Sequence, residues 1–97
     1  MRVEETKVYR EWINSLKDLA ARARIQVRDD RLVHGNPGTH RHLTDAMSEL
    51  KIDIGLGYRV YYTLRGTRLL LLLAGGSKST QSRDIANAIR LALNYEE

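Results

Sequence analysis

The sequence predicts an α+β fold: a small antiparallel β-sheet packed against helices on one side, in the order β-α-α-β-β-β-α. Three observations lead to this prediction. Apolar residues recur at helical spacing in the first third of the chain and near its end, residues 46–54 alternate between apolar and polar, and residues 69–74 are all apolar. Because 97 residues can bury one hydrophobic core, residues 1–97 are expected to form a single domain.

The N-terminal part is predicted to be a short strand followed by a helical hairpin. Residues 3–7 form the expected strand, and Val8, Trp12 and Leu16 then recur at the spacing of a helix. A second helical stretch runs to about residue 32. The Gly-Asn-Pro-Gly sequence that follows ends it, because proline and glycine interrupt regular structure. The apolar side of this second helix is expected to consist of Leu19, Ala20, Ala23 and Val27.

Two strands joined by a hairpin loop are predicted next. Residues 46–54 alternate as a half-buried strand does, residues 58–64 are rich in aromatic and β-branched side chains, and a Gly-Leu-Gly loop separates them. Placing Ile54 opposite Tyr58 keeps the apolar residues on one face. The resulting pairs are Ile52–Val60 and Leu50–Tyr62 on the core face, with Asp53–Arg59, Lys51–Tyr61 and Glu49–Thr63 on the other.

A buried strand and a final helix complete the predicted fold. Residues 69–74 are too few to span a bilayer and are typical of a strand that is buried on both faces. Thr80 is a suitable N-cap for the last helix, because its hydroxyl can accept a hydrogen bond from a free backbone N–H. The buried stripe of that helix is expected to be Ile85, Ala88, Ile89, Ala92 and Leu93.

The composition limits the possible partners and compartments. The formal charge is +4, so a nucleic acid, a ribosome or an acidic protein would each be a suitable partner. The chain has no cysteine, which excludes a disulfide framework and a cysteine metal site. The first residues lack the apolar segment of a signal peptide. We therefore expect a soluble, cytoplasmic protein without a membrane segment.

One stretch of the chain has basic residues but no acidic ones. Residues 54–83 contain five Lys or Arg and no Asp or Glu, and the same stretch holds the most strand-like sequence, Tyr58-Arg-Val-Tyr-Tyr-Thr-Leu64. Arginine and tyrosine on one face of a strand, with no carboxylate in the same stretch, favour an anionic partner such as a polyphosphate chain.

Four short sequences then occur in a recognisable series. They are Glu49-Leu-Lys51, Gly55-Leu-Gly-Tyr-Arg-Val-Tyr-Tyr62, Leu72-Leu-Ala-Gly-Gly-Ser-Lys-Ser-Thr-Gln81 and Asp84-Ile-Ala-Asn-Ala88. Together with the preceding helical pair, the series resembles the HigB-like addiction-module killer family of the RelE/ParE toxin superfamily. The resemblance covers nearly the whole chain. Two residues depart from the family pattern, because Ser77 and Lys51 stand where relatives often have Asp and Arg.

The resemblance implies a RelE-like fold and the toxin of a bacterial type II toxin–antitoxin system. Such a toxin is neutralised by a small cognate antitoxin, often a helix-turn-helix protein, and relatives commonly cleave mRNA on the ribosome. The superfamily also contains poisons of DNA gyrase, so the fold alone does not decide the target. A further alternative is an inactive member that serves as an antitoxin-binding corepressor.

The basic residues are compatible with RNA cleavage that needs no metal or other cofactor. The 2′-hydroxyl of RNA attacks the adjacent phosphate, and the protein neutralises the growing negative charge. Arg59 is the expected transition-state stabiliser, Lys78 is the expected phosphate contact before the last helix, and Lys51 assists. The alternatives are a salt bridge from Arg59 to Asp53 and a solvated Lys78.

Proton transfer is assigned to Glu49 or Tyr61. Glu49 is expected on the same face as Lys51 and would act as the general base, or else simply balance the lysine charge. Tyr61 would stack against a base or donate a proton, or else cover the sheet surface.

Other polar residues have weaker functional interpretations. His34, His40 and His42 lack the acidic or cysteine ligands that would complete a metal site. Arg24 would share one helix face with Arg28 and Arg31, where they either contact RNA or an antitoxin or are simply solvated. Trp12 is expected in the core. The additional RNA contacts predicted are Arg28, Arg31, Arg65 and Arg83.

Overall fold

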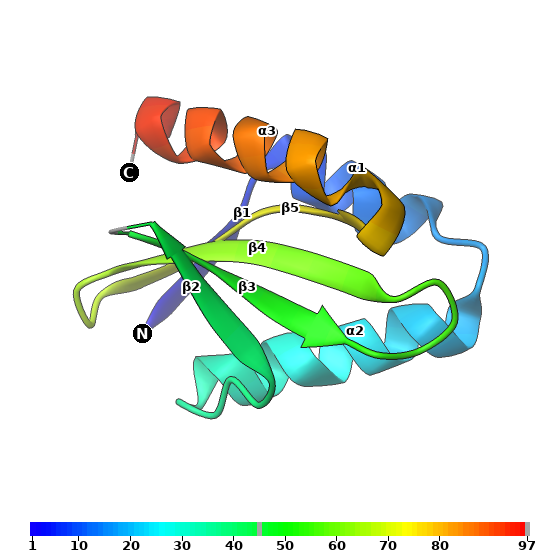
Figure 1. Ribbon diagram of the computed structural model, residues 1–97. Helices are drawn as coiled ribbons and strands as arrows, with labels where there is room; N and C mark the ends of the chain where they lie inside the picture. Colours follow the sequence, from blue (N-terminus) through cyan, green and yellow to red (C-terminus); the bar gives the residue numbers. More distant parts are fainter. Residues whose placement is uncertain (45, 97) are drawn as a thin grey trace.

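A computed structural model describes residues 1–44 and 46–96 (Figure 1). Its elements are β1 (Arg2–Glu5), α1 (Lys7–Ser15), α2 (Leu19–Val33), β2 (His40–Thr44), β3 (Met47–Ile52), β4 (Tyr58–Arg65), β5 (Leu69–Ser77), the 3₁₀ turn η1 (Lys78–Thr80) and α3 (Gln81–Asn94). The five strands form one sheet in the order β1-β5-β4-β3-β2. β1 is parallel to β5, and the other neighbouring strands are antiparallel. No helix within the described residues is long and apolar enough to cross a membrane.

The α+β class is confirmed, but three details of the predicted architecture are wrong. The sheet is mixed rather than antiparallel, because β1 pairs with β5 in parallel. The additional strand β2 is an edge strand of mostly exposed polar residues, so it lacks the apolar alternation that marks a strand. Helices cover both faces because β4 and β5 bear buried side chains on both sides.

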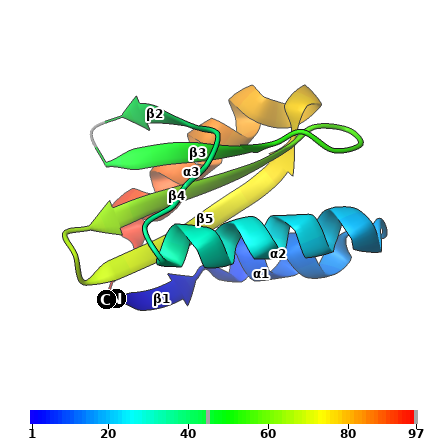
Figure 2. The same cartoon turned by 90° about the horizontal axis from the view of Figure 1, so that it is seen from below.

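The predicted helical hairpin is confirmed, since α1 and α2 are consecutive helices, and in Figure 2 they overlap with α2 in front of α1. The Thr6 side chain caps α1 by accepting a hydrogen bond from the Tyr9 backbone N–H at 3.0 Å. The Asp18 side chain caps α2 by accepting one from the Ala21 N–H at 3.1 Å. Each cap satisfies a backbone donor that the helix itself leaves unpaired, which fixes where the helix begins.

The buried face of α2 is not the one that the sequence favours. Leu19 is 70% exposed, whereas Ala21, Ile25 and Leu32 are buried. Asp29 lies on this inward side of the helix and accepts a hydrogen bond from the Tyr9 hydroxyl. A carboxylate within the stripe hides the apolar periodicity, so the sequence pattern indicates the wrong side.

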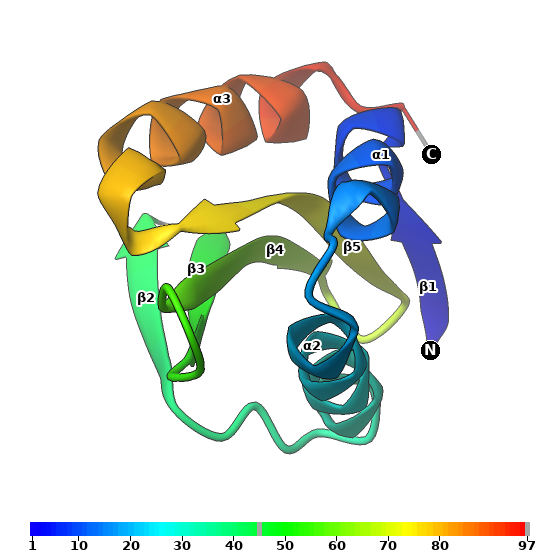
Figure 3. The ribbon, with the colours of Figure 1, turned by 90° about the vertical axis from the view of Figure 1, so that its right-hand side faces the viewer.

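Two apolar clusters lie on opposite faces of the sheet, and Figure 3 shows α2 and α3 on either side of it. One joins α1 and α2 to the side chains of Leu50, Val60, Tyr62, Leu70 and Leu72, among others. The second lies under α3 and includes Met47, Tyr61, Leu69, Leu71, Leu73 and Ala88. β5 therefore contributes to both clusters, as predicted. Leu93 is an exception to the predicted stripe of α3, because its side chain is exposed.

The hairpin of β3 and β4 has the predicted faces but a different register. Lys51 lies opposite Arg59, and Glu49 lies opposite Tyr61, two residues away from the predicted pairing. A shift of two residues leaves every side chain on its face, since side chains alternate along a strand. The loop is longer than predicted because residues 53 and 54 belong to it rather than to β3.

Candidate functional site

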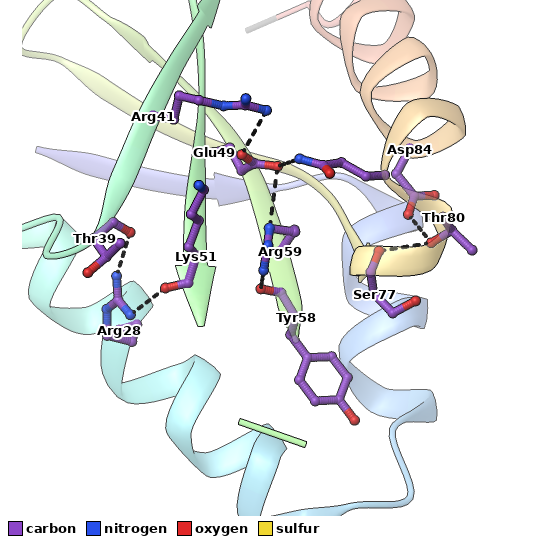
Figure 4. Close-up of polar contacts among 11 residues, drawn as sticks. Arg28, Thr39, Arg41, Glu49, Lys51, Tyr58, Arg59, Ser77, Thr80 and Asp84 are labelled. Atoms are coloured by element: carbon purple, nitrogen blue, oxygen red, sulfur yellow. Dashed lines mark hydrogen bonds and ion pairs between the residues drawn. The ribbon is translucent and has the colours of Figure 1, made fainter. Parts of the chain in front are cut away.

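The predicted catalytic residues of the sheet share the face that α3 covers. Glu49 and Lys51 extend from β3, and Arg59 and Tyr61 extend from the neighbouring β4. Figure 4 shows Lys51 and Arg59 side by side, with Glu49 between Arg59 and the more peripheral Arg41. The register therefore brings four of the predicted site residues together.

Glu49 is fully buried, with 0% of its surface exposed. Its Oε1 accepts a hydrogen bond from Gln81 Nε2 at 2.7 Å and lies 3.7 Å from Arg59 Nε. Its Oε2 lies 3.3 Å from Arg41 Nη2. A buried carboxylate requires partners of this kind, because the loss of water around a charge is costly. In this arrangement Glu49 does not reach a bound RNA, so the predicted role as a general base is not supported by its position.

Arg59 is also buried, with 6% of its surface exposed. Its Nη1 donates a hydrogen bond to the Tyr58 carbonyl at 3.1 Å. The carboxylate beside it is Glu49 rather than the predicted Asp53, because the two-residue shift in register changes its cross-strand neighbours. Nη1 also lies close to Gly57, so the guanidinium group sits where the β3–β4 loop rejoins the sheet.

Tyr61 has no exposed surface, and its hydroxyl has no hydrogen-bond partner among the described residues. Burial, reinforced by the nearby Glu49 and Asp84 carboxylates, raises the pKa of this hydroxyl well above its usual range. Tyr61 therefore stays protonated. Because α3 covers the ring, the predicted stacking on a nucleobase is not supported by the position of Tyr61.

Lys78 reaches the same end of the sheet from another element. Its backbone N–H donates a hydrogen bond to the Gly57 carbonyl at 2.7 Å, which ties η1 to the β3–β4 loop. Its side chain is exposed and lines a cleft of about 360 Å³ together with residues 53–57. A second cleft of about 370 Å³ runs along residues 78–83 and includes Arg83, which is also exposed. Both clefts are open to solvent, and each is lined by at least one basic side chain.

The other predicted RNA contacts lie elsewhere, and two of them hold the fold together. Arg28 donates hydrogen bonds to the carbonyls of Lys51, Pro37 and Thr39, and thereby attaches α2 to the outer strands. Arg65 donates to the carbonyls of Ala92 and Tyr95 at the C-terminal end of α3. The two Arg65 bonds satisfy carbonyls that a helix leaves unpaired at its C-terminal end.

Arg31 is exposed in the last turn of α2. The histidines do not assemble into a site either. Within residues 1–44 and 46–96, no group of three His, Cys, Asp or Glu side chains is placed to hold a metal ion.

Two contributors to the site are not indicated by the sequence, and a third, Asp84, begins one of the four short sequences named above. Arg41 belongs to the unpredicted strand β2, and Gln81 has no charge that would draw notice. Asp84 accepts a hydrogen bond from the Thr80 hydroxyl at 2.5 Å and lies 3.8 Å from Arg83 Nε. Thr80 is the predicted N-cap, but its side chain makes no capping bond and donates to Asp84 instead.

The two glycines before Ser77 bring helices close to the sheet. A Cβ atom on Gly75 would overlap the ring of Trp12, and one on Gly76 would overlap the carboxylate of Asp84. The absence of a side chain at these two positions therefore allows α1 and α3 to pack closely against β5. Lys78 follows directly after this packed segment, so its position relative to both helices is fixed.

Comparison with known proteins identifies a relative, but the description of that relative names no activity. No protein-family model matches the sequence. A protein of Haemophilus influenzae, described as an uncharacterized protein, is 42% identical over 92 residues, which cover 95% of this chain and 93% of the relative. Identity at this level across almost the whole of both chains shows common descent. The chain therefore belongs to the same protein family as this Haemophilus influenzae protein.

Proposed function

We propose that this chain has a RelE-like fold and is the toxin of a bacterial type II toxin–antitoxin system that cleaves mRNA without a metal ion. The observation that carries the proposal is the gathering of cations at one end of the sheet. Lys51 lies opposite Arg59, and η1 brings Lys78 against the loop that joins their strands. The resemblance of residues 49–88 to the HigB-like family supports the same function.

The cations would act on the phosphate that the RNA 2′-hydroxyl attacks. Lys51 and Lys78 are accessible and would hold the phosphate oxygens. Arg59 is buried as Glu49 and Tyr61 are, so it would stabilise the developing negative charge through its electrostatic field rather than by direct contact, with Glu49 fixing the orientation of its guanidinium group. Because the charge of Arg59 is permanent, this contribution would not depend on a proton transfer.

The proton acceptor in this scheme differs from the one that the sequence suggests. Glu49 and Tyr61 are buried, so neither touches a substrate in this arrangement. Asp53 is exposed and lines the same cleft as Lys78. We therefore assign the 2′ proton to the Asp53 carboxylate, which is close to a phosphate-binding lysine and free to contact the ribose. As the 2′ oxygen bonds to phosphorus, the bond from phosphorus to the 5′ oxygen would break, which leaves a 2′,3′-cyclic phosphate and a 5′ hydroxyl that takes its proton from solvent water.

The proposed partners follow from the same function. A small antitoxin, in the simplest case a helix-turn-helix protein, would neutralise the toxin, and the ribosome would present the mRNA in the cytoplasm. The positive charge of the chain is suited to both a ribosomal and an acidic protein surface.

A second function, without catalysis, is favoured by one observation. Both side chains that the sequence suggests for proton transfer are covered by α3. A protein on this fold that only binds, either as a poison of DNA gyrase or as an antitoxin-binding corepressor, needs no exposed acid or base.

A pair of assays separates these functions. The purified protein is added to translating ribosomes carrying a defined mRNA, and in parallel to gyrase with supercoiled DNA. We expect mRNA cleavage that is unchanged when the protein has been treated with EDTA and dialysed before it is added, is lost in the Lys51→Ala/Lys78→Ala protein, and falls at least tenfold in Asp53→Asn. The matched control is Arg90→Ala, which removes an exposed arginine from α3. Gyrase-dependent DNA breaks with intact mRNA would replace the proposal with the gyrase function, and inactivity in both assays would favour the corepressor.

A further inference from the structure

We infer that a cleft beside Lys78 binds one nucleobase of a single-stranded RNA, next to the phosphate that the lysine contacts. This inference rests on the proposed function, because it concerns how the same end of the sheet holds RNA. The cleft has a volume of about 290 Å³ and lies where α1, the β3–β4 loop, the end of β5 and the start of α3 meet.

The walls of the cleft are apolar and partly aromatic. Leu56 is 74% exposed at the tip of the β3–β4 loop, although a leucine in a loop gains nothing from contact with water. Trp12 is half-buried, with its ring against the backbone of Gly75, and Tyr58 closes the cleft from the sheet. Flat aromatic surfaces of this kind bind bases by stacking, irrespective of the base sequence.

The rim of the cleft is polar and carries a cation. Arg83 is exposed on one side, where its Nε lies 3.8 Å from Asp84 Oδ1. The carboxylate of Asp84 is itself buried and already accepts a hydrogen bond from Thr80. The accessible rim therefore presents a guanidinium group, which can donate to the acceptor edge of a base or stack on its face.

The position of the cleft relative to Lys78 is suited to a nucleotide. Leu56 lines this cleft and also the cleft that contains Lys78 and Asp53, so a single loop residue separates the two. Phosphate oxygens bound by Lys78 on one side of Leu56 would leave the attached base on the other side. An alternating arrangement of cations and apolar surface is the pattern by which proteins bind single-stranded nucleic acids.

Trp12 provides a direct measurement because it is the one tryptophan in the chain. We propose a fluorescence titration with a short 2′-O-methyl RNA, which the protein cannot cleave through a 2′-hydroxyl. Stacking in the cleft is expected to quench Trp12 emission in a saturable manner. An oligomer of the same length without bases keeps the phosphates and should bind through the cations with little quenching.

Leu56→Asp is the decisive variant, because a residue so exposed can be changed without disturbing the core. It places a carboxylate in the apolar wall, and we expect binding of the 2′-O-methyl RNA to weaken at least tenfold. Leu93→Asp is the matched control: Leu93 is similarly exposed, but on the C-terminal part of α3, and its substitution should leave binding unchanged.

The outcomes separate this inference from the proposed function. Equal quenching by the oligomer without bases, or unchanged RNA binding by Leu56→Asp, would overturn the base site even if the protein cleaves mRNA. Quenching by the cognate antitoxin with none by RNA would assign the cleft to a protein partner and overturn it as well. Base-dependent quenching that Leu56→Asp abolishes would support the site, also in a protein that proves unable to cleave.

Discussion

Two buried carboxylates on opposite faces of the sheet have very different surroundings. Glu49, under α3, lies close to two guanidinium groups and accepts a hydrogen bond from Gln81. Asp29, on α2, accepts a hydrogen bond from the Tyr9 hydroxyl, and its Oδ1 is buried without a hydrogen-bond partner among the described residues. Burial raises the pKa of the Asp29 carboxyl to about 7, while the Tyr9 hydrogen bond opposes this shift.

The difference shows what each carboxylate does for the protein. Glu49 belongs to a cluster that positions Arg59, so its charge is useful where it lies. The charge of Asp29 has no equivalent cluster, and ionisation of this group works against the folded state. Removing a charge should therefore change the stability of the protein in opposite directions at the two sites. Loss of a cation beside Glu49 should destabilise the protein, whereas loss of the Asp29 charge should stabilise it.

The largest expected effect comes from removing Arg59. In Arg59→Met the buried Glu49 loses one of its two guanidinium neighbours, and we expect the free energy of unfolding to fall by about 3–5 kcal/mol. Urea denaturation measures this loss. The Glu49→Gln/Arg59→Met double variant should recover most of it, because no charge then remains buried. A loss in the double variant as large as in the single variant would show that packing, rather than charge, determines the effect.

Arg41→Met is the matched control for that experiment. Its guanidinium group contacts the same carboxylate at 3.3 Å, but its side chain is half exposed. Water reaches the half-exposed Arg41 guanidinium and screens its contact, and Arg59 still neutralises the carboxylate, so the expected loss is below about 1 kcal/mol.

A smaller effect, of opposite sign, is expected at Asp29. The folded-state pKa of about 7 lies above the ordinary value of 3.8, so between these values the folded protein holds a proton that the unfolded chain releases. The free energy of unfolding should therefore fall as the pH rises from about 4 to 7, and then level off. Asp29→Asn removes this dependence and should stabilise the protein at pH 8 by about 2 kcal/mol.

Thermal and urea unfolding at pH 4.5 and pH 8 would test this difference. Asp30→Asn, which changes the exposed neighbouring residue, should show no comparable gain. An Asp29→Asn protein that is no more stable than the wild type at pH 8 would contradict the interpretation of Asp29.

The smallest of the three effects is expected for Gln81. Gln81→Ala removes the 2.7 Å hydrogen bond to Glu49, and we expect a loss of about 1–2 kcal/mol in the free energy of unfolding. Ser82→Ala alters the exposed residue that follows and serves as the control. Equal stabilities of the two variants would mean that water replaces the Gln81 amide at no cost, and that the Glu49 cluster is less tightly closed than its geometry indicates.

Much of the fold follows from local pattern. The unbroken apolar run of residues 69–74 predicts a strand buried on both faces, and the alternation around Leu50 predicts the two faces of β3 correctly. The edge strand β2 and the inward face of α2 escape the same reasoning. In both segments tertiary contacts decide the structure: β2 is held by pairing with β3, and Asp29 is held by Tyr9 from another helix.

The site is predictable to a smaller extent. The alternation of a strand places Glu49, Lys51, Arg59 and Tyr61 on one face, and this prediction is confirmed. Which of them is accessible depends on what covers that face, and α3 begins twenty residues after Tyr61. The partners Arg41 and Gln81 come from elements that the strand pattern does not contain, so sequence reasoning alone does not find them.

The two glycines at the end of β5 determine which positions of this protein can tolerate substitution. The indole of Trp12 and the carboxylate of Asp84 approach bare main chain, so the distance between the first and the last helix is set there by the thickness of a polypeptide backbone. A single added methyl group would force the helices apart and carry the adjoining Lys78 out of place. Substitutions in the exposed loop beyond, at Leu56 for instance, leave this spacing untouched, so specificity can change there while the framework stays the same.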